Sequence, residues 1–499
     1  MRMTCAGSWS FLVAASLCLV TGCRDNKTLG PAPVKAAGTA GAGAAGKGAA
    51  GRSAAGSSAA GAKAEVVDPA ECPVMVNDAD CDKTRRPLVF IHGTVANGES
   101  FSYPALLLAS NGYCADRIRA VEYNSLVALP CPDGMTGCPF MLDRNETYAR
   151  AKAAVDAAID ELRKETGADK VDLLGHSQGA GHGSKYAGEN PDKVAHYIHL
   201  AGQQLESDPG GVPTLCISST GDAPRECKTT KNVVFQDDKL DHAAVSGSRE
   251  SFVEIYKFLN DDKEPKYDTV QCGSTIMVEG RAPTFGDNTF LEKAEIDVFE
   301  LGDNPYQRGA PIKNYELGPD GKFGPFEVKR GKYYEFKLTP PPGDMRKPRH
   351  AYMLPFKRSD RLVRLNFETT DATASATGKL VNYDNAHSVL VVRKRQGAFL
   401  FGRDSLKIDG FEVINEVNAK QRMVVVGLYL YDKSLTDKPG PGDGMSSGGS
   451  IISGTFVNSA DVFIPTQDMH FIDVEYGDKK LKVQNWPSAR QGLSLVLVD

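Results

Sequence analysis

The tightest constraint in the sequence is the run Gly175-His176-Ser177-Gln178-Gly179. It follows the apolar stretch Lys170 to Leu174 and precedes a segment of helical character, so it predicts a sharp turn from a strand into a helix. The two glycines have no Cβ, which leaves the serine hydroxyl exposed at the end of the strand. Ser177 is therefore a candidate nucleophile, although an ordinary glycine-serine loop would give the same five letters.

Three further features occur in the chain order expected of an α/β-hydrolase. The first is the stretch Arg86 to Ile91, which predicts a buried strand ending in His92-Gly93-Thr94. Enzymes of this fold place half of an oxyanion hole there. We expect the backbone N–H groups of Thr94 and Gln178 to be the oxyanion donors.

The other two features supply an acid and a base. Thr214 to Ser219 predicts a short strand that ends in Thr220-Gly221-Asp222, and His242 lies just before the helical run Arg249 to Leu259. The order Ser177, Asp222, His242 is the order of the α/β-hydrolases and differs from those of other serine-protease folds. These three residues are the predicted catalytic residues.

Other residues compete for these roles. Asp208 also follows a strand and is the alternative acid, whereas Asp241 is an immediate neighbour of His242 and cannot easily orient its ring. We expect His92 to shape the oxyanion turn and His176 to be the variable position of the motif. His182 falls on the following helix, where a packed or solvent-facing role is expected.

No other chemistry is indicated by the sequence. The nine histidines are scattered, and no cysteine pair has a histidine partner at zinc-finger spacing, so neither a metal nor a cofactor is expected. The formal net charge is -5, with both signs spread along the chain, which gives no support for nucleic-acid binding.

The N-terminus predicts export. A short basic start is followed by the apolar run Trp9 to Val20 and then by Val20-Thr21-Gly22-Cys23, which has the form of a bacterial lipobox. Cys23 would become the lipidated first residue of an envelope lipoprotein, in the outer membrane or at the cell surface. An ordinary cleaved signal peptide, and hence a secreted protein, is the alternative.

The composition divides the rest of the chain. From about Asn26 to Ala64 the sequence is nearly all Ala, Gly, Ser and Lys, which cannot bury a core and predicts a flexible tether. The expected organisation is a signal peptide (1–22), the tether (23–65), an α/β-hydrolase domain (66–265) and an all-β C-terminal region (266–499), with a possible sub-boundary near 345.

Eight cysteines remain after Cys23, and an even number in an exported chain suggests disulfides. Nearest-neighbour pairing would join Cys72 to Cys81, Cys131 to Cys138 and Cys216 to Cys227. Cys114 and Cys272 would be left, and could link the domain to the following region. The bond between Cys216 and Cys227 would brace the loop that carries Asp222.

The region after Lys266 predicts strands. Ala294 to Val298 and Tyr334 to Leu338 alternate apolar and charged residues, and Met423 to Tyr431 and Leu493 to Val498 are further strand candidates. Many short strands with Gly/Pro turns predict a β-sandwich or barrel. Within this region basic residues from Arg346 to Arg364 interleave with aromatic ones. They would form either an edge that binds an anionic lipid surface or ordinary solvent-exposed strand faces.

The sequence resembles the archaeal-type long-chain lipase/carboxylesterase family. The residues that carry the resemblance are Ala109 to Tyr113, Glu122-Tyr123, Gly167 to Ser177, Val212 to Leu215, Phe326 to Val328, Tyr333 to Phe336 and Pro355-Phe356. The resemblance implies an α/β-hydrolase domain joined to an all-β lipid-binding domain that helps to present a long acyl chain to the serine. An ester or lipid is then the expected substrate.

The chain departs from that family at two places. Some relatives carry the acid after the strand that here ends in Ala201-Gly202, and Ala201 cannot serve, which favours Asp222. The insertion between Tyr123 and Glu146 is shorter and more polar than the family's apolar lid. Polyester, thioester or amide cleavage, and a binding lipoprotein with a vestigial hydrolase domain, remain alternatives at this stage.

Overall fold

A computed structural model of the chain describes residues 74–126, 144–302, 308–368, 381, 383–433, 435, 440–441, 456–466 and 471–499. All of them belong to one of two units of the chain, Pro69–Asp499. The signal peptide, Cys23, the tether and the greater part of the shortened insertion after Tyr123 lie outside the described residues. No helix in the described part is long and apolar enough to cross a membrane.

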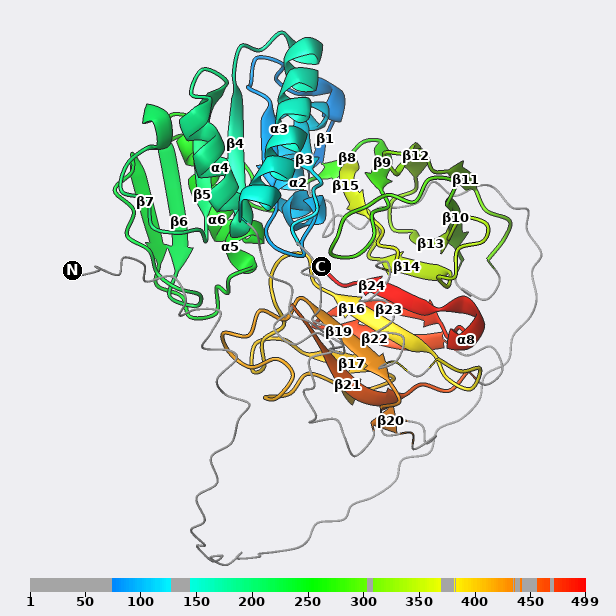
Figure 1. The fold of residues 1–499 in the computed structure, drawn as a ribbon. Helices are drawn as coiled ribbons and strands as arrows, with labels where there is room; N and C mark the ends of the chain where they lie inside the picture. The colour runs from blue at the N-terminus through cyan, green and yellow to red at the C-terminus, as the bar shows by residue number, and fades with distance from the viewer. Residues whose placement is uncertain are drawn as a thin grey trace, which may run out of the picture. The chain divides into compact units, whose positions relative to one another are not determined.

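The first half of this unit is built on a parallel six-stranded sheet (Figure 1). Its spatial order is β3 (Ile118–Val121), β2 (Leu88–Ile91), β4 (Val171–His176), β5 (Val194–Leu200), β6 (Thr214–Ser219) and β7 (Lys231–Phe235). The central strands β2, β4 and β6 are buried along their whole length, as expected for a parallel sheet covered on both faces. The structure confirms the predicted α/β-hydrolase fold.

Helices cover both faces of this sheet. On one face α3 (Arg144–Thr166) and α4 (Gln178–Glu189) pack against alternate residues of β2, such as Val89 and Ile91. On the other, Leu88 and Phe90 pack against α2 (Ser102–Ser110), α5 (Ala244–Gly247) and α6 (Arg249–Leu259). Short 3-10 helices complete the connections: η1 (Asp78–Asp80), η2 (Gly98–Phe101), η3 (Ala115–Arg117) and η4 (Pro209–Gly211).

The second half is a mixed nine-stranded sheet with a smaller sheet packed on each face. The large sheet has the order β11 (Lys313–Glu316), β10 (Glu295–Leu301), β13 (Tyr333–Thr339), β14 (Arg349–Met353), β24 (Leu493–Leu497), β16 (Val389–Arg393), β19 (Gly427–Tyr431), β21 (Val457–Phe463) and β20 (Gly440–Pro441). The smaller sheets are β12 (Lys322–Val328), β9 (Ile276–Arg281) and β15 (Asp360–Arg364), and β18 (Phe411–Glu412), β17 (Leu406–Ile408), β22 (Phe471–Tyr476) and β23 (Lys479–Gln484). A short helix, α8 (Ser488–Gln491), precedes β24.

Alternate residues of the central strands explain this layering. In β16, Val389 and Val391 belong to the core shared with β9 and β12, whereas Leu390 and Val392 belong to the core shared with β17, β22 and β23. The large sheet is therefore the middle of three layers. Strands β13 and β14, on either side of residue 345, are antiparallel neighbours within it. The structure confirms the predicted all-β region.

The two halves share buried contacts. Strand β1 (Met75–Val76) pairs in parallel with β8 (Cys272–Gly273), and Leu362 of β15 joins the core beneath α2. The Arg364 Nε atom lies 2.6 Å from Glu122 Oε1, and both side chains are nearly inaccessible to solvent. Removing one member would leave an unpaired buried charge, so the halves depend on each other.

The disulfide prediction is wrong in part. Cys81 bonds to Cys114, which excludes the predicted bond between Cys72 and Cys81 and the suggested link from Cys114 to Cys272. Cys272 is disulfide-bonded as well. The bond between Cys216 and Cys227 is confirmed, and the predicted pair Cys131 and Cys138 lies outside the described residues.

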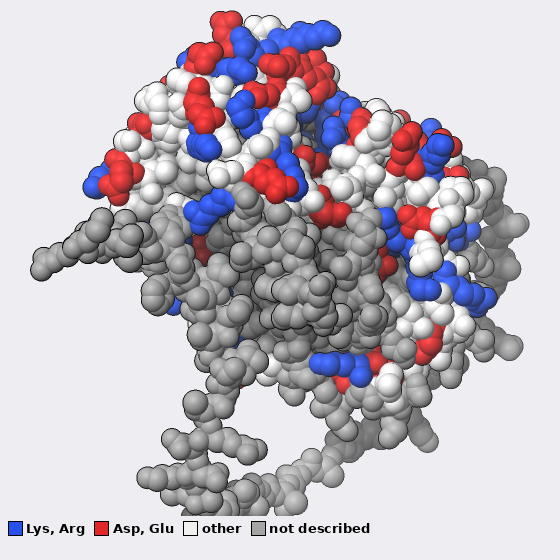
Figure 2. Space-filling model, in the orientation of Figure 1, with Lys and Arg blue, Asp and Glu red and all other residues white. Residues whose placement is uncertain are grey.

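The basic and aromatic edge suggested for the β region is in large part buried. Arg349, Arg358 and Arg364 are buried, with 5%, 1% and 2% of their surface exposed, so these guanidinium groups are not available to a lipid surface. Arg358 pairs instead with Asp78. On the face drawn in Figure 2, groups of both signs alternate among the coloured residues, as the scattered charges of the sequence predict.

Candidate active site

Ser177 lies in the turn between β4 and α4, in a backbone conformation that L-residues rarely adopt (φ 57°, ψ −119°). Two glycines make the turn possible. A Cβ on Gly179 would overlap the carbonyl oxygens of Ile91 and His92, and one on Gly175 would overlap the Gly179 carbonyl. The turn is further held by the Ser177 N–H, which donates to the Leu200 carbonyl at 2.9 Å.

The structure brings Asp222 and His242 together. Asp222 follows β6, His242 lies just before α5, and Asp222 Oδ2 is 2.9 Å from His242 Nδ1. Burial raises the pKa of Asp222, but the hydrogen bond to His242 and the nearby Arg225 outweigh it, so the net pKa is lowered. An ionised carboxylate at Nδ1 would keep the proton on that nitrogen and leave Nε2 free to accept another.

His176 has a role that the sequence did not reveal. Its Nε2 atom lies 2.8 Å from the backbone carbonyl oxygen of His242, and burial lowers the pKa of the His176 ring to about 3. A neutral ring can donate its Nε2 proton to that carbonyl at ordinary pH. His176 therefore fixes the loop that carries His242, and only the folded arrangement shows this.

The two expected oxyanion donors are neighbours. The Thr94 hydroxyl donates to Gln178 Oε1 at 3.2 Å, so the two residues lie against each other. Gln178 is the first residue of α4, and the N–H of a first helical residue has no partner inside its helix. Thr94 lies in the loop that follows β2, called the oxyanion loop below. The next N–H along this loop, that of Val95, donates to the Ser125 hydroxyl at 2.8 Å.

Asn288 of the β region supports the oxyanion loop. Its side-chain amide nitrogen lies 2.8 Å from the Ala96 carbonyl oxygen, 3.1 Å from that of Tyr123 and 3.3 Å from His92 Nε2. His92 is fully buried, burial lowers the pKa of its ring, and its Nδ1 lies 2.8 Å from the Gly93 carbonyl. His92 thus shapes the turn, as the sequence suggested, but Asn288 gave no signal in the sequence.

A cavity that is partly open to solvent lies beside these residues. Ser177, His242, His176 and Thr94 line one side of it. The β region supplies much of the remainder, with the apolar side chains of Phe285, Val424, Val426 and Phe456 and the charged residues Arg393, Lys394 and Arg395. The cavity therefore combines a polar group of candidate catalytic residues with an apolar wall.

The competing residues lie elsewhere or do other work. Asp208 accepts hydrogen bonds from the N–H (2.9 Å) and the hydroxyl (2.5 Å) of Thr230, on the loop before β7. Asp241 accepts from backbone N–H groups after His242. His182 is buried, its ring lies 5.8 Å from that of Tyr123, and burial lowers its pKa to about 4.

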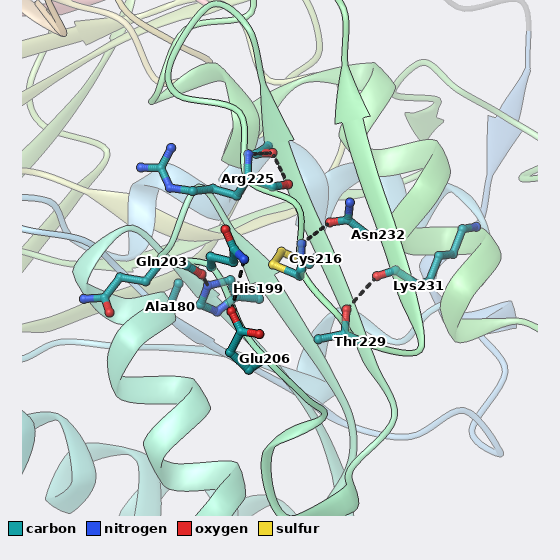
Figure 3. The surroundings of a disulfide bond; sticks show 12 residues. Ala180, His199, Gln203, Glu206, Cys216, Arg225, Thr229, Lys231 and Asn232 are labelled. Atoms are coloured by element: carbon teal, nitrogen blue, oxygen red, sulfur yellow. Dashed lines mark hydrogen bonds between the residues drawn. A yellow bond between two sulfur atoms is a disulfide. The ribbon is translucent and has the colours of Figure 1, made fainter.

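The disulfide between Cys216 and Cys227 closes the loop that carries Asp222 (Figure 3). The loop is also held by hydrogen bonds at both ends. The Arg225 N–H donates to the Ser218 hydroxyl at 2.9 Å, and the Cys227 N–H donates to Asn232 Oδ1 at 3.2 Å. Asp222 is thus presented by a cross-linked loop. In the described part of the chain, no group of three or more His, Cys, Asp or Glu side chains could hold a metal ion.

Two family models match parts of the sequence. The α/β hydrolase fold matches residues 130–217 and the lipase C-terminal domain matches residues 274–370. The fold is that of an α/β-hydrolase. The second match places a lipase-type domain directly after it, where the structure has β9 to β15. A comparison with curated proteins found no match.

Solved structures that match part of this chain include several hydrolases. The pyrethroid hydrolase PytH is 15% identical over 37% of this chain and 100% of that chain, with a TM-score of 0.26. Naproxen esterase and the carboxylesterase CesB, both from Bacillus subtilis, are 13% and 12% identical over 36% of this chain and 86% of theirs, each with a TM-score of 0.26. Similarities this low carry no argument about substrate.

Proposed function

We propose that this protein is a serine hydrolase that cleaves carboxylic esters through an acyl-enzyme, as a lipase or esterase. The observation that carries the proposal is the 2.9 Å contact between Asp222 and His242 beside a cavity that Ser177 also lines. The unusual backbone angles of Ser177 support it, since such a conformation persists mainly where function requires it.

In the proposed reaction, His242 Nε2 takes the Ser177 hydroxyl proton as Oγ bonds to the substrate carbonyl carbon. The negative charge on the carbonyl oxygen would be stabilised by the backbone N–H groups of Thr94 and Gln178. The intermediate then expels an alcohol, which receives the proton from His242. Water attacks the acyl-enzyme in the same way and releases a carboxylic acid and free Ser177.

The apolar wall supports a substrate with a hydrophobic part. Phe285 lies within the match to the lipase C-terminal domain, whereas Val424, Val426 and Phe456 follow it in the chain. An acyl chain that lies along this wall would lose contact with water. This favours esters of long acyl chains, in agreement with the resemblance to the archaeal-type long-chain lipase/carboxylesterase family.

Ser177→Ala should abolish ester hydrolysis and leave the fold unchanged, because it removes only the attacking oxygen. The loss in kcat should be on the order of 10⁴-fold or more. Activity is measured with p-nitrophenyl esters of rising chain length, and a fluorophosphonate probe reports the reactive serine. Near-wild-type turnover, with the probe on another serine, would overturn the proposal. A panel including thioesters and amides separates the other acyl substrates.

A binding lipoprotein with an inactive hydrolase domain would show no turnover and no labelling by the same probe. For location, we propose an envelope lipoprotein held by a lipid on Cys23, on the basis of the lipobox at residues 20–23. Metabolic labelling with a radioactive fatty acid tests this. A full-length protein that takes up no label would be an ordinary secreted protein.

A further inference from the structure

Asp241 is the buried residue next to the proposed base. Its carboxylate accepts hydrogen bonds from backbone N–H groups and from Arg403 of the β region. Oδ1 accepts from the N–H groups of Ala243 (3.0 Å) and Ala244 (2.9 Å), where α5 begins. The Ala398 N–H lies 3.1 Å from both carboxylate oxygens. Only 7% of the Asp241 surface is exposed.

Arg403 completes this arrangement from the β region. Its Nη1 atom lies 2.6 Å from the Lys239 carbonyl oxygen and 3.1 Å from Asp241 Oδ2. A second arginine nitrogen, Nη2, lies 2.8 Å from Asp404 Oδ2, which holds the guanidinium in place. Arg403 therefore binds the loop that carries His242 at two positions, Lys239 and Asp241.

The loop is also confined on its other side. A Cβ on Gly221 would come within 3.0 Å of the Asp238 carbonyl oxygen, so this loop lies directly against the residue before Asp222. His176 holds the His242 carbonyl, and Asp222 holds the ring. His242 is thus held by contacts within the hydrolase domain and by its neighbour Asp241, which the β region anchors.

We propose that Asp241 and Arg403 are positioning residues for the proposed base, so that the β region aligns His242 with Ser177 as well as lining the cavity. The proposal rests on the hydrolase function given above. Neither residue lines the cavity, so neither is expected to contact substrate. A misplacement of the reacting nitrogen by about 1 Å can lower the rate of the chemical step on the order of 10²-fold.

The decisive variant is Arg403→Met in the full chain, since methionine fills a similar space without hydrogen-bond donors. We expect kcat for p-nitrophenyl butyrate to fall about ten- to a hundred-fold, with KM within about two-fold of wild type. Arg403→Lys should recover part of the loss, because one ammonium can still reach the carboxylate. Hydrogen exchange followed by mass spectrometry should show faster exchange in residues 236–248 and unchanged exchange in residues 171–189.

Arg308→Met is the matched control. Arg308 also belongs to the β region, has a side chain 20% exposed against 21% for Arg403, and pairs with a buried carboxylate, that of Glu335. It lines no part of the cavity. We expect Arg308→Met to leave kcat unchanged even where it lowers the melting temperature. An equal loss of kcat in both variants would overturn the positioning role.

A second variant keeps the test decisive if Arg403→Met fails to fold. Asp241→Asn keeps one acceptor oxygen and the volume of the side chain but loses the charge that Arg403 binds. It should lower kcat and speed exchange in residues 236–248; unchanged kcat and exchange would overturn the proposal. If the wild-type protein cleaves no ester, the hydrolase proposal fails, and the exchange measurement still decides whether Arg403 holds the loop.

Discussion

The backbone of Ser177 has a conformation that is unfavourable for any residue with a side chain, and its neighbours hold it there. A non-glycine residue at positive φ costs on the order of 1–3 kcal/mol, and Ser177 has φ 57°. Glycine at this position would remove the strain but also the nucleophile. The strain is maintained because Gly175 and Gly179 allow β4, α4 and β2 to approach more closely than any side chain would permit.

Single substitutions also test which of two aspartates, Asp222 or Asp208, is the catalytic acid. Asp222→Asn should lower kcat on the order of 10⁴-fold, because the amide would stabilise the wrong tautomer of His242. Asp208→Asn should leave kcat within a few-fold of wild type, since Asp208 contacts Thr230 and not His242. Steady-state kinetics of the two variants on one ester provide the comparison. The reverse ranking would move the acid upstream of β6.

The sequence pointed to the candidate catalytic residues but not to the residues that support them. Ser177, Asp222 and His242 each follow a recognisable strand or precede a recognisable helix. Asn288 and His176 act through contacts with backbone carbonyls, and such contacts depend on which loops meet in space. A hydrogen bond to a carbonyl leaves no pattern along the chain.

Among the elements, the packing of α4 on β2 is the closest contact near the candidate site. Gly179→Ala should disrupt it, because the added Cβ would overlap two backbone carbonyls that cannot move independently of β2. Gly181→Ala, two residues along the same helix, adds its Cβ where no neighbour lies within 4 Å. It should raise stability by about 0.5–1 kcal/mol, as alanine favours a helix over glycine.

Urea unfolding and ester hydrolysis of both variants test this contrast. The first should lose activity and several kcal/mol of stability, as overpacking against backbone does, and the second should keep its activity. A Gly179→Ala protein with wild-type activity and stability would show that the turn tolerates a side chain.

Element boundaries followed from sequence where the chain marks them strongly. The predicted strand Thr214 to Ser219 and helix Arg249 to Leu259 coincide with β6 and α6. The expected strand from Met423 is shorter, since β19 begins at Gly427. The preceding segment turns instead toward the cavity, where Val424 and Val426 form part of its wall. Alternation of apolar residues cannot distinguish a strand from such a lining segment.

Features that join distant parts of the molecule were the hardest to predict. Cys81 lies closer in sequence to Cys72 than to Cys114, yet it bonds to Cys114, which follows α2. Arg358 and Arg364 resemble surface charges in the sequence, but each is buried against a carboxylate of the first half, Asp78 or Glu122. Sequence patterns describe one segment at a time, and these contacts depend on how segments meet.

Buried histidines make the stability of the whole unit depend on pH. Burial lowers the pKa of His176 to about 3 and that of His199 to about 4. The unfolded chain, with histidine pKa values near 6.5, therefore binds protons below that pH that the folded state does not. The contribution of these histidines to the free energy of unfolding is fully present above about pH 7. It should fall by about 2 kcal/mol per histidine between pH 7 and pH 5.

Urea unfolding of the wild-type protein and His199→Gln at pH 7 and pH 5 measures this effect. The variant lacks one of the buried histidines whose pKa is lowered, so its loss of stability on acidification should be smaller by about 2 kcal/mol. The difference between the two pH values is compared, and not the absolute stability, because the substitution also changes contacts with Tyr197 and Gln203. An equal acid-induced loss in both proteins would contradict the assignment.

The role of the β region in substrate choice cannot be tested by deleting it, because Glu122 would lose Arg364 and the core beneath α2 would lose Leu362. A single substitution in the cavity wall is sharper. Val426→Phe narrows the cavity from the β side, so it should lower kcat/KM for long-chain p-nitrophenyl esters about ten-fold or more. Acetate hydrolysis should change little, because binding energy far from the reacting carbon matters only to substrates that reach it.

Val417→Phe makes the same change at a position that is 46% exposed and outside the cavity, and it should leave the ratio of long-chain to acetate activity unchanged. Both variants are compared with wild type on one series of chain lengths. An equal fall at every length in Val426→Phe would mean that the wall supports the site without binding the acyl chain. Unchanged long-chain activity would mean that the acyl chain of the substrate does not lie along this wall. A phenyl ring at Val426 would otherwise block its path.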